Sequence, residues 1–409
     1  MKQSFRPPFL LYSYLVTEML GPFFASFVIM NAVFFLVRLI PFLNVVLDLN
    51  IGPADFVRLF SYLFPNMFLY SIPMAGMLAV IVGFTRLSAD TEILALKASG
   101  VSIYQTLPPV MIFGIIISLV TGYFSIKLIP VGEIAMKQLM FQVAKEKIDK
   151  GIKEHQFTDA LGDVVVYVNR IDKETGRWKD VWVSDKRGHY YPTITMAHEG
   201  VMRTDLAAMS VTIILKEGTL HRPGKKGSQV VSFDRYQINI PLQVPTVIGK
   251  ENVAARSSST LSMAELKASA EEIGPSTPRG RYRLVQYYKR LVLPVGCFIL
   301  TLLGLPLGLQ SGPGRKAAGL PLGLGFFILY YVGYTLGKTV AEDSNLPVII
   351  PIWAPNLIFL IGAIILIHRV AREKPLFPKP VIEKLLDLRD HFLAPVWNWI
   401  KGKKRRKKA

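Results

Sequence analysis

The sequence predicts an α+β membrane protein, in which six transmembrane helices, arranged three and three, flank an inserted β-jelly-roll domain. Three observations favour this class. The chain of 409 residues is 51% hydrophobic, with a mean hydropathy of +0.35. Six long runs lack Asp, Glu, Lys, Arg and His, and three of them lie on each side of a long polar segment. That polar segment contains short runs of β-branched and aromatic residues, which are typical of strands.

A run of about 20 apolar residues is long enough to cross the hydrocarbon core of a bilayer. The runs that meet this length, to within about a residue, are Met19–Val37, Leu59–Thr85, Ala98–Ile126, Leu291–Gly314, Ala317–Gly337 and Leu346–Ile367. The first run lacks a small-residue cleavage site, so we expect it to be retained. The preceding stretch, Pro8–Leu20, predicts a short amphipathic helix along the membrane interface.

These runs divide the chain into three spans in residues 1–130, an inserted domain in 131–285, three spans in 286–370 and a tail in 371–409. The tail holds 12 Lys and Arg against 4 Asp and Glu, which predicts a cytoplasmic position by the positive-inside rule. Six spans then place both termini in the cytoplasm and the inserted domain outside it. We interpret the tail as a contact for anionic lipid, in preference to nucleic acid.

Strands are predicted at Val164–Val168, Val181–Val183, Val211–Leu215 and Val230–Phe233. Turn-forming residues separate them, which predicts an antiparallel sandwich or jelly roll. In the last strand the apolar alternation passes through Phe233 and resumes at Tyr236, and this one-residue slip predicts a β-bulge. A helical pattern at Met263–Ile273 leads the chain back to the membrane.

No motif of a catalytic site survives inspection, and we expect a non-catalytic chain that binds no cofactor or metal. The segment Gly333–Thr339 resembles a phosphate-binding loop, but it has one residue too few between its glycines and ends an apolar run. We interpret these glycines as helix-packing positions. The single cysteine and six scattered histidines offer no metal-ligand spacing. Work by this protein therefore needs a partner or an ion gradient.

The loop between the second and third predicted spans reads Arg86-Leu-Ser-Ala-Asp-Thr-Glu-Ile-Leu-Ala-Leu-Lys-Ala-Ser-Gly100. Ser88 is a candidate N-cap, Asp90 and Glu92 fall in the first turn, where the helix dipole favours anions, and Gly100 is a candidate C-terminal residue. The pattern predicts a short capped cytoplasmic helix within residues 86–100, which would suit the transmission of force. Composition alone leaves an ordinary hairpin loop with solvated charges open.

This loop resembles the coupling helix of the F and G permeases of the lipopolysaccharide transport system, whose pattern is Arg-x-x-x-(Asp/Glu)-x-Glu-(Ile/Leu)-x-x-(Leu/Met)-x-Ala-x-Gly. The resemblance extends over nearly the whole chain, including Trp353-Ala-Pro-Asn-Leu357 near the start of the last span. The segments Leu36–Ile40, Lys216–Leu220 and Phe233–Tyr236 are more similar to the F partner than to the G partner.

The resemblance implies a permease subunit of the bacterial inner membrane, with a periplasmic domain. Such a subunit takes part in ATP-driven extraction of lipopolysaccharide and passes it to a periplasmic bridge for delivery to the outer membrane. ATP would be hydrolysed by a separate subunit. The expected partners are a second homologous permease subunit in a heterodimer, two cytoplasmic ATPase subunits and a single-span periplasmic bridge protein.

The same resemblance implies roles for particular residues. The ATPase-coupling residues are Glu92, which would contact the ATPase, with Arg86, Asp90 and Lys97 around it. Arg38 and Lys127, at the outer ends of the first and third predicted spans, would bind lipopolysaccharide phosphates. The alternative for both cations is an interfacial anchor whose charged end reaches toward water.

Two other classes of function stay open. An ion-driven secondary transporter would need buried acidic residues or broken helices in mid-membrane, and the six runs contain no Asp or Glu. A non-transporting scaffold would use its outer domain to bind an envelope partner and would tolerate loss of Glu92. The β domain itself is either a conduit for acyl chains or a spacer.

Overall fold

The computed structural model of the chain describes residues 9–49, 51–158, 163–172, 175–187, 191–205, 210–224, 227–241, 258–310, 319–344 and 346–374. The predicted basic tail beyond residue 374 lies outside this part. The chain forms two compact units. One comprises Met1–Val33, Phe68–Ile126 and Met263–Ala409, and the other comprises Phe34–Met67 and Lys127–Ser262.

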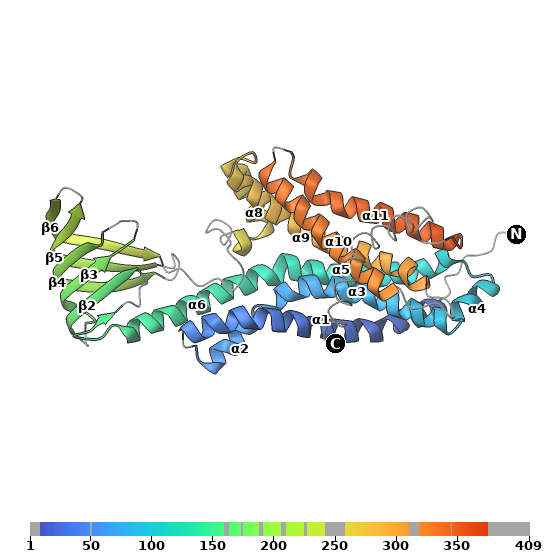
Figure 1. The fold of residues 1–409 in the computed structure, drawn as a ribbon, viewed down its shortest axis with the longest axis horizontal. Coiled ribbons are helices and arrows are strands. Elements are labelled where there is room, and N and C mark those ends of the chain that lie inside the picture. The colour runs from blue at the N-terminus through green and yellow to red at the C-terminus, as the bar shows by residue number, and fades with distance from the viewer. Residues whose placement is uncertain are drawn as a thin grey trace, which may run out of the picture. The chain divides into compact units, whose positions relative to one another are not determined.

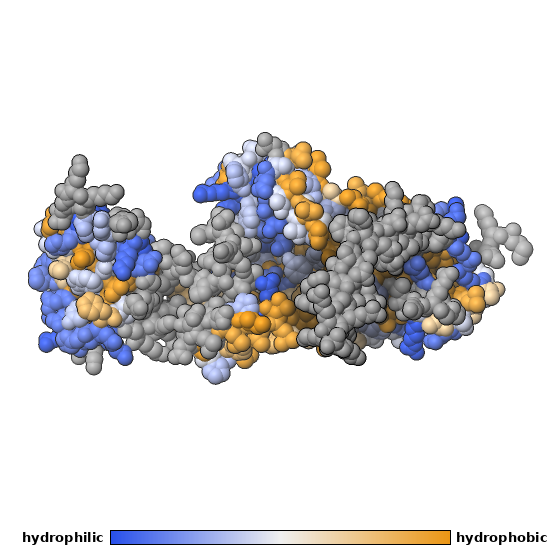
Figure 2. Space-filling model, in the orientation of Figure 1, coloured by the Kyte–Doolittle hydropathy of each residue, from blue (hydrophilic) through white to orange (hydrophobic). Residues whose placement is uncertain are grey.

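The prediction of six membrane spans is confirmed, since six described helices are long and apolar enough to cross a membrane. The spans lie in α1 (Phe9–Leu49), α3 (Phe64–Ala89), the continuous helical segment Ile103–Val143 that contains α5 (Leu107–Tyr123), α9 (Pro278–Leu309), α10 (Gly319–Asp343) and α11 (Ile349–Ala371), shown in Figure 1. Helix α5 continues through a π-helical turn, η2 (Phe124–Leu128), into α6 (Ile129–Gly151). Hydrophobic residues, orange in Figure 2, cover much of the visible helices, whereas the visible strands are mostly blue.

Two boundaries differ from those predicted. Helix α1 is a single helix from Phe9, so the separate interfacial helix predicted at Pro8–Leu20 is wrong. Leu15 and Met19 are fully buried in one apolar cluster with residues of α3, and this packing keeps the first turns in line with the rest of α1. The second span begins at Phe64, because Leu59 belongs to a short separate helix, α2 (Pro53–Ser61).

Helices α3 and α9 are the central helices, since 83% of the most apolar stretch of each is buried, against 22% for α10. Glycines on α9 let it approach α3 closely. A Cβ atom at Gly304 would lie 2.8 Å from the carbonyl oxygen of Met77, and one at Gly308 would lie 2.9 Å from that of Ile81. Close approach of backbones at small residues is the usual way in which membrane helices associate.

A buried polar contact joins α9, α10 and α11. The Tyr330 hydroxyl on α10 donates to Oδ1 of Asn356 on α11 over 2.8 Å, and Nδ2 of Asn356 donates to the Val292 carbonyl on α9 over 2.9 Å. Asn356 is the asparagine of the Trp-Ala-Pro-Asn-Leu motif. Helices α10 and α11 also approach closely at Gly337, where a Cβ would collide with the carbonyl of Pro351. This agrees with the interpretation of Gly337 as a packing position.

The inserted domain is an antiparallel sheet whose described strands pair in sequence order, β1 to β6. The strands are β1 (Phe157–Thr158), β2 (Val164–Ile171), β3 (Trp178–Asp185), β4 (Thr193–Asp205), β5 (Ser210–Gly224) and β6 (Gly227–Pro241). The α+β class with an inserted β domain is confirmed. The described connectivity is a meander, without the crossing connections of a Greek key. Residues from β2 to β6 and Ile152 enclose one apolar core.

The slip predicted between Phe233 and Tyr236 is present, but the bulge proposed as its cause is wrong. Both residues pack against the apolar core. Lys216 lies opposite Arg235 and Gly218 lies opposite Phe233, so neither β5 nor β6 contains an extra residue. The alternation of inward-facing and outward-facing residues therefore shifts in β5 and β6 at the same place.

In the other long strands, the alternation of buried and exposed residues also shifts by one residue. The shift occurs at the same row of paired residues, which runs across the sheet. The first two buried residues of β3 are Trp178 and Val181, and Asp180 between them has a left-handed φ of 52°. In β5, Glu217 has a φ of 49°. Polar residues occupy the row from β2 to β6, namely Asn169, Asp180, His198, Glu217 and Asp234. This row of polar residues, the polar crease, crosses the sheet without altering the register of strand pairing.

Candidate functional site

Helix α4 (Glu92–Ala98) is the short helix that the loop pattern predicts, but it begins later than expected. Helix α3 runs to Ala89, so Ser88 is buried inside α3 and the prediction that it is an N-cap is wrong. Thr91, in the left-handed region with a φ of 60°, separates the two helices and makes no side-chain cap. Burial of the last turn of α3 outweighs the capping preference of serine.

The end of α4 agrees with the prediction. Gly100 has a φ of 85°, which a residue without Cβ adopts at little cost. Its amide donates to the Lys97 carbonyl, and the amide of Val101 donates to the Leu96 carbonyl over 2.9 Å. These two bonds form a Schellman motif, which ends the helix sharply.

Glu92 is held by the first helix of the chain. The Tyr14 hydroxyl on α1 donates to Oε2 of Glu92 over 2.7 Å. This distance is typical of a charge-assisted hydrogen bond to a carboxylate. Among the described residues, Oε1 of Glu92 has no hydrogen-bond partner, so one carboxylate oxygen is available to another molecule.

The predicted cations of the loop also have partners within the chain. The Arg86 guanidinium lies 3.3 Å from the Glu18 carboxylate on α1 and 3.7 Å from that of Asp90. The Lys97 ammonium donates to Glu373, just after α11, over 2.9 Å. This bond lowers the pKa of Glu373 below its ordinary value. The loop is thus tied to α1 and to the end of α11.

The opposite side of α4 is open. Ile93 packs into the apolar cluster beneath the helix, whereas Leu94 is 64% exposed. An exposed leucine beside a half-buried carboxylate gives α4 a small surface of mixed chemistry. Leu94 was not among the predicted site residues, because a single leucine in a short loop carries no distinguishing pattern.

Four partner residues were also missed by sequence reasoning. They are Tyr14, Glu18, Glu373 and His368, the last of which bonds the Tyr104 hydroxyl through Nδ1 over 2.9 Å. Tyr14 and Glu92 are 78 residues apart in the chain, and Lys97 and Glu373 are 276 apart. No local spacing could have paired them.

The two predicted lipopolysaccharide-binding cations lie within helices and not at helix ends as expected. Arg38 is half-buried on α1, which continues to Leu49. Lys127 is exposed in η2, the π-helical turn that runs on into α6. Neither has a hydrogen bond or ion pair with any residue that the structure describes. Single π-helical turns are frequent at functional sites.

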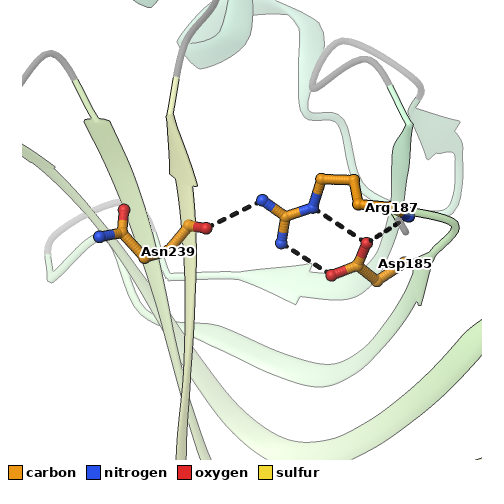
Figure 3. Close-up of polar contacts among 3 residues, drawn as sticks. All are labelled: Asp185, Arg187 and Asn239. Atoms are coloured by element: carbon orange, nitrogen blue, oxygen red, sulfur yellow. Dashed lines mark hydrogen bonds and ion pairs between the residues drawn. The ribbon is translucent and has the colours of Figure 1, made fainter. Parts of the chain in front are cut away.

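The sheet carries a third arrangement of charge, drawn in Figure 3. After β3, the Arg187 guanidinium binds the Asp185 carboxylate through two bonds, of 3.0 Å from Nε and 2.7 Å from Nη2. Nη1 donates to the Asn239 carbonyl on β6 over 2.9 Å. Asp185 raises the pKa of Arg187, which therefore stays charged. The three bonds of the Arg187 guanidinium to Asp185 and Asn239 form a clasp. Since β3 and β6 are not neighbours in the sheet, this clasp joins two strands that the strand pairing leaves apart.

The helices and the inserted sheet define a multi-pass membrane protein whose second loop holds a short helix against the ends of its spans. The chain belongs to the family described as Lipopolysaccharide export system permease LptF/LptG, which matches residues 13–369. This is a family of transport permeases and not of enzymes, and the resemblance found in the sequence is confirmed.

Individual relatives are similar over most of the chain. The chain is 25% identical over 365 residues to "Lipopolysaccharide export system permease protein LptF" of Escherichia coli (strain K12), covering 86% of this chain and 93% of that protein. The protein of the same name from Shigella flexneri gives the same values. The chain is also 20% identical over 327 residues to "Uncharacterized protein RP871" of Rickettsia prowazekii, covering 79% and 89%.

Proposed function

We propose that this chain is the F-type permease subunit of an ATP-driven transporter, which extracts lipopolysaccharide from the inner membrane and passes it to a periplasmic bridge. It pairs with a second homologous permease subunit, and two cytoplasmic ATPase subunits supply the energy. The family match over residues 13–369 carries this proposal, and the relatives named LptF support the subtype. Both termini are cytoplasmic, and the β domain is periplasmic.

The structure of the loop supports an ATPase contact at α4. A short helix that transmits force must not move independently of the spans. Contacts with α1 and with the end of α11 tie α4 to two of them. The open Oε1 of Glu92 and the exposed Leu94 offer a polar and an apolar contact to a partner. No cofactor is needed in this chain, because ATP is bound by the partner.

The outer cations support a lipid phosphate site. Arg38 presents a planar guanidinium that matches two oxygens of a phosphate, and Lys127 presents a compact point charge. A half-buried guanidinium with no partner in the described part of the chain is costly unless a ligand or a lipid headgroup compensates it. Lipopolysaccharide carries phosphates on its lipid headgroup, which would meet this need.

The β domain supports transfer to another β domain. Its apolar core is enclosed mainly by the curved sheet itself, so opening of the sheet would expose a surface suited to acyl chains. Among the described strands, β6 is a long edge strand, and β1 at the other edge has only two residues. Edge strands with free backbone groups add strands from a partner.

The test is lipopolysaccharide release from proteoliposomes that hold this chain with its candidate partners, with a soluble periplasmic acceptor outside. We expect release with ATP and the acceptor together, and none with an ion gradient alone. Release driven by an ion gradient would establish the secondary transporter. Assembly of the complex without release under either condition would support the scaffold.

A further inference from the structure

The contact between Tyr14 and Glu92 connects the loop to a long helix. Tyr14 lies near the start of α1, the uninterrupted helix that also bears Arg38. Its hydroxyl is 2.7 Å from Oε2 of Glu92, at the first residue of α4. A movement of α4 that preserves this bond must therefore move the start of α1 with it.

A second contact lies one helical turn along α1. Residues four apart share a helix face, so Tyr14 and Glu18 lie on the same face of α1. Glu18 lies 3.3 Å from Arg86 near the end of α3. Its backbone carbonyl would lie only 3.3 Å from a Cβ at Gly83, which shows how closely α1 and α3 approach.

Apolar packing completes the junction beneath these polar contacts. Leu15 and Met19, next to the two polar residues in sequence, are fully buried in the cluster that contains Ile93 of α4. The apolar contacts hold the elements together but allow sliding, since they have no preferred direction. The hydroxyl-to-carboxylate bond is directional, and it fixes the rotamer of Glu92.

We infer that Tyr14 is a positioning residue, which holds one oxygen of Glu92 so that the other faces the ATPase, and which makes α1 move with α4. This inference rests on the proposed function. Glu92 then bridges two proteins, with Oε2 bound to α1 and Oε1 open to a donor of the ATPase. The nucleotide-driven movement then reaches the Arg38-bearing helix through Glu92 and Tyr14, in addition to the contacts of α1 with α3.

The test compares Tyr14→Phe with Tyr12→Phe in the reconstituted complex. Tyr12 lies on the same helix and has no hydrogen bond with a described residue, so it controls for the general effect of losing a hydroxyl. The readout is lipopolysaccharide released per ATP hydrolysed, compared between complexes that are assembled to the same extent. We expect Tyr14→Phe to lower this ratio roughly three- to tenfold, the size of one lost ordinary hydrogen bond, because the contact is exposed to solvent, and Tyr12→Phe to leave it unchanged.

The Glu92→Ala background shows whether Tyr14 acts through Glu92. There, Tyr14→Phe should cause no further rise in hydrogen exchange of the α4 amides, because its partner is already absent. An equal rise in both backgrounds, or a release ratio for Tyr14→Phe equal to that for Tyr12→Phe in otherwise wild-type protein, would overturn the inference.

Hydrogen exchange of the α4 amides in the same complex separates this inference from the proposed function. Faster exchange at residues 92–99 in Tyr14→Phe, but not in Tyr12→Phe, is expected whether or not lipid is released. A wild-type complex that releases no lipopolysaccharide with ATP would refute the proposed function. Unchanged exchange in Tyr14→Phe would refute the positioning role.

Discussion

The loop around α4 and the outer cations differ in how their charges are compensated. In the loop, Glu92, Arg86 and Lys97 each contact a side chain from another part of the sequence. Arg38 and Lys127 contact no polar group of the described chain. Charges that are paired within a chain fix its own elements, whereas a charge without a partner is suited to a ligand. Loss of a paired charge should therefore alter stability or coupling, and loss of an unpaired one should alter binding.

The largest expected effect is on lipid binding at Arg38. Removal of the guanidinium in Arg38→Ala should weaken binding of lipopolysaccharide by about tenfold or more, because hydrogen bonds to charged groups contribute roughly 1.5–3 kcal/mol. Competition against a fluorescent lipid A analogue in nanodiscs measures this change. The affinity of Arg38→Lys should fall between those of the wild type and Arg38→Ala, since lysine keeps the charge but loses the second bond to the phosphate. Unchanged affinity with a lower melting temperature would make Arg38 an interfacial anchor.

Arg187 extends the comparison to a paired cation in the β domain. Arg187→Met should cost about 1–3 kcal/mol of local stability, because it removes the two guanidinium bonds to Asp185 and the bond to the Asn239 carbonyl. Hydrogen exchange at the β6 amides should rise. Lys186→Met is the matched control, since the neighbouring lysine side chain is exposed and makes none of the bonds of the clasp. Equal exchange in both variants would show that the clasp does not hold β6.

Lys127 should have a smaller effect than Arg38. Lys127→Ala is expected to weaken lipopolysaccharide binding about threefold, because an exposed ammonium contributes less than 1 kcal/mol. Its melting temperature should equal that of the wild type. The same competition assay measures the affinity, and raised salt should reduce the difference between the two proteins. A larger loss than that of Arg38→Ala would reverse the proposed order of the two cations.

The smallest expected effect concerns the ion pair between Lys97 and Glu373. Because Lys97 lowers the pKa of Glu373, the carboxylate stabilises the fold above its unfolded pKa, and this stabilisation is lost as the pH falls through the lowered value. Glu373→Gln should therefore melt slightly below the wild type at neutral pH and equally at acidic pH. Lys97→Met should abolish the same dependence. A difference that grows on acidification would contradict the pairing.

The parts of this structure that follow from sequence are those set by local pattern. The six apolar runs predicted the six spans, and Met263–Ile273 predicted α8 (Met263–Ile273), because an apolar run or a helical period needs no distant partner. The left-handed residue at Gly100 followed from the same kind of signal.

The predictions that failed concern features that depend on packing between residues far apart in the sequence. Ser88 has the chemistry of an N-cap, but burial against other helices extends α3 past it. The slip at Phe233 was visible in one strand, although its cause is a crease shared by neighbouring strands. Glu92 was identified by its motif, yet its partner, Tyr14, could be found only in three dimensions.

The measurement that tests the central claim most directly is the Glu92→Ala variant in the reconstituted complex, with lipopolysaccharide release, ATP hydrolysis and assembly recorded together. If α4 couples the ATPase to the spans, the variant should still assemble, but it should lose ATP-dependent release. Release at the wild-type rate from a complex that contains Glu92→Ala would contradict the account.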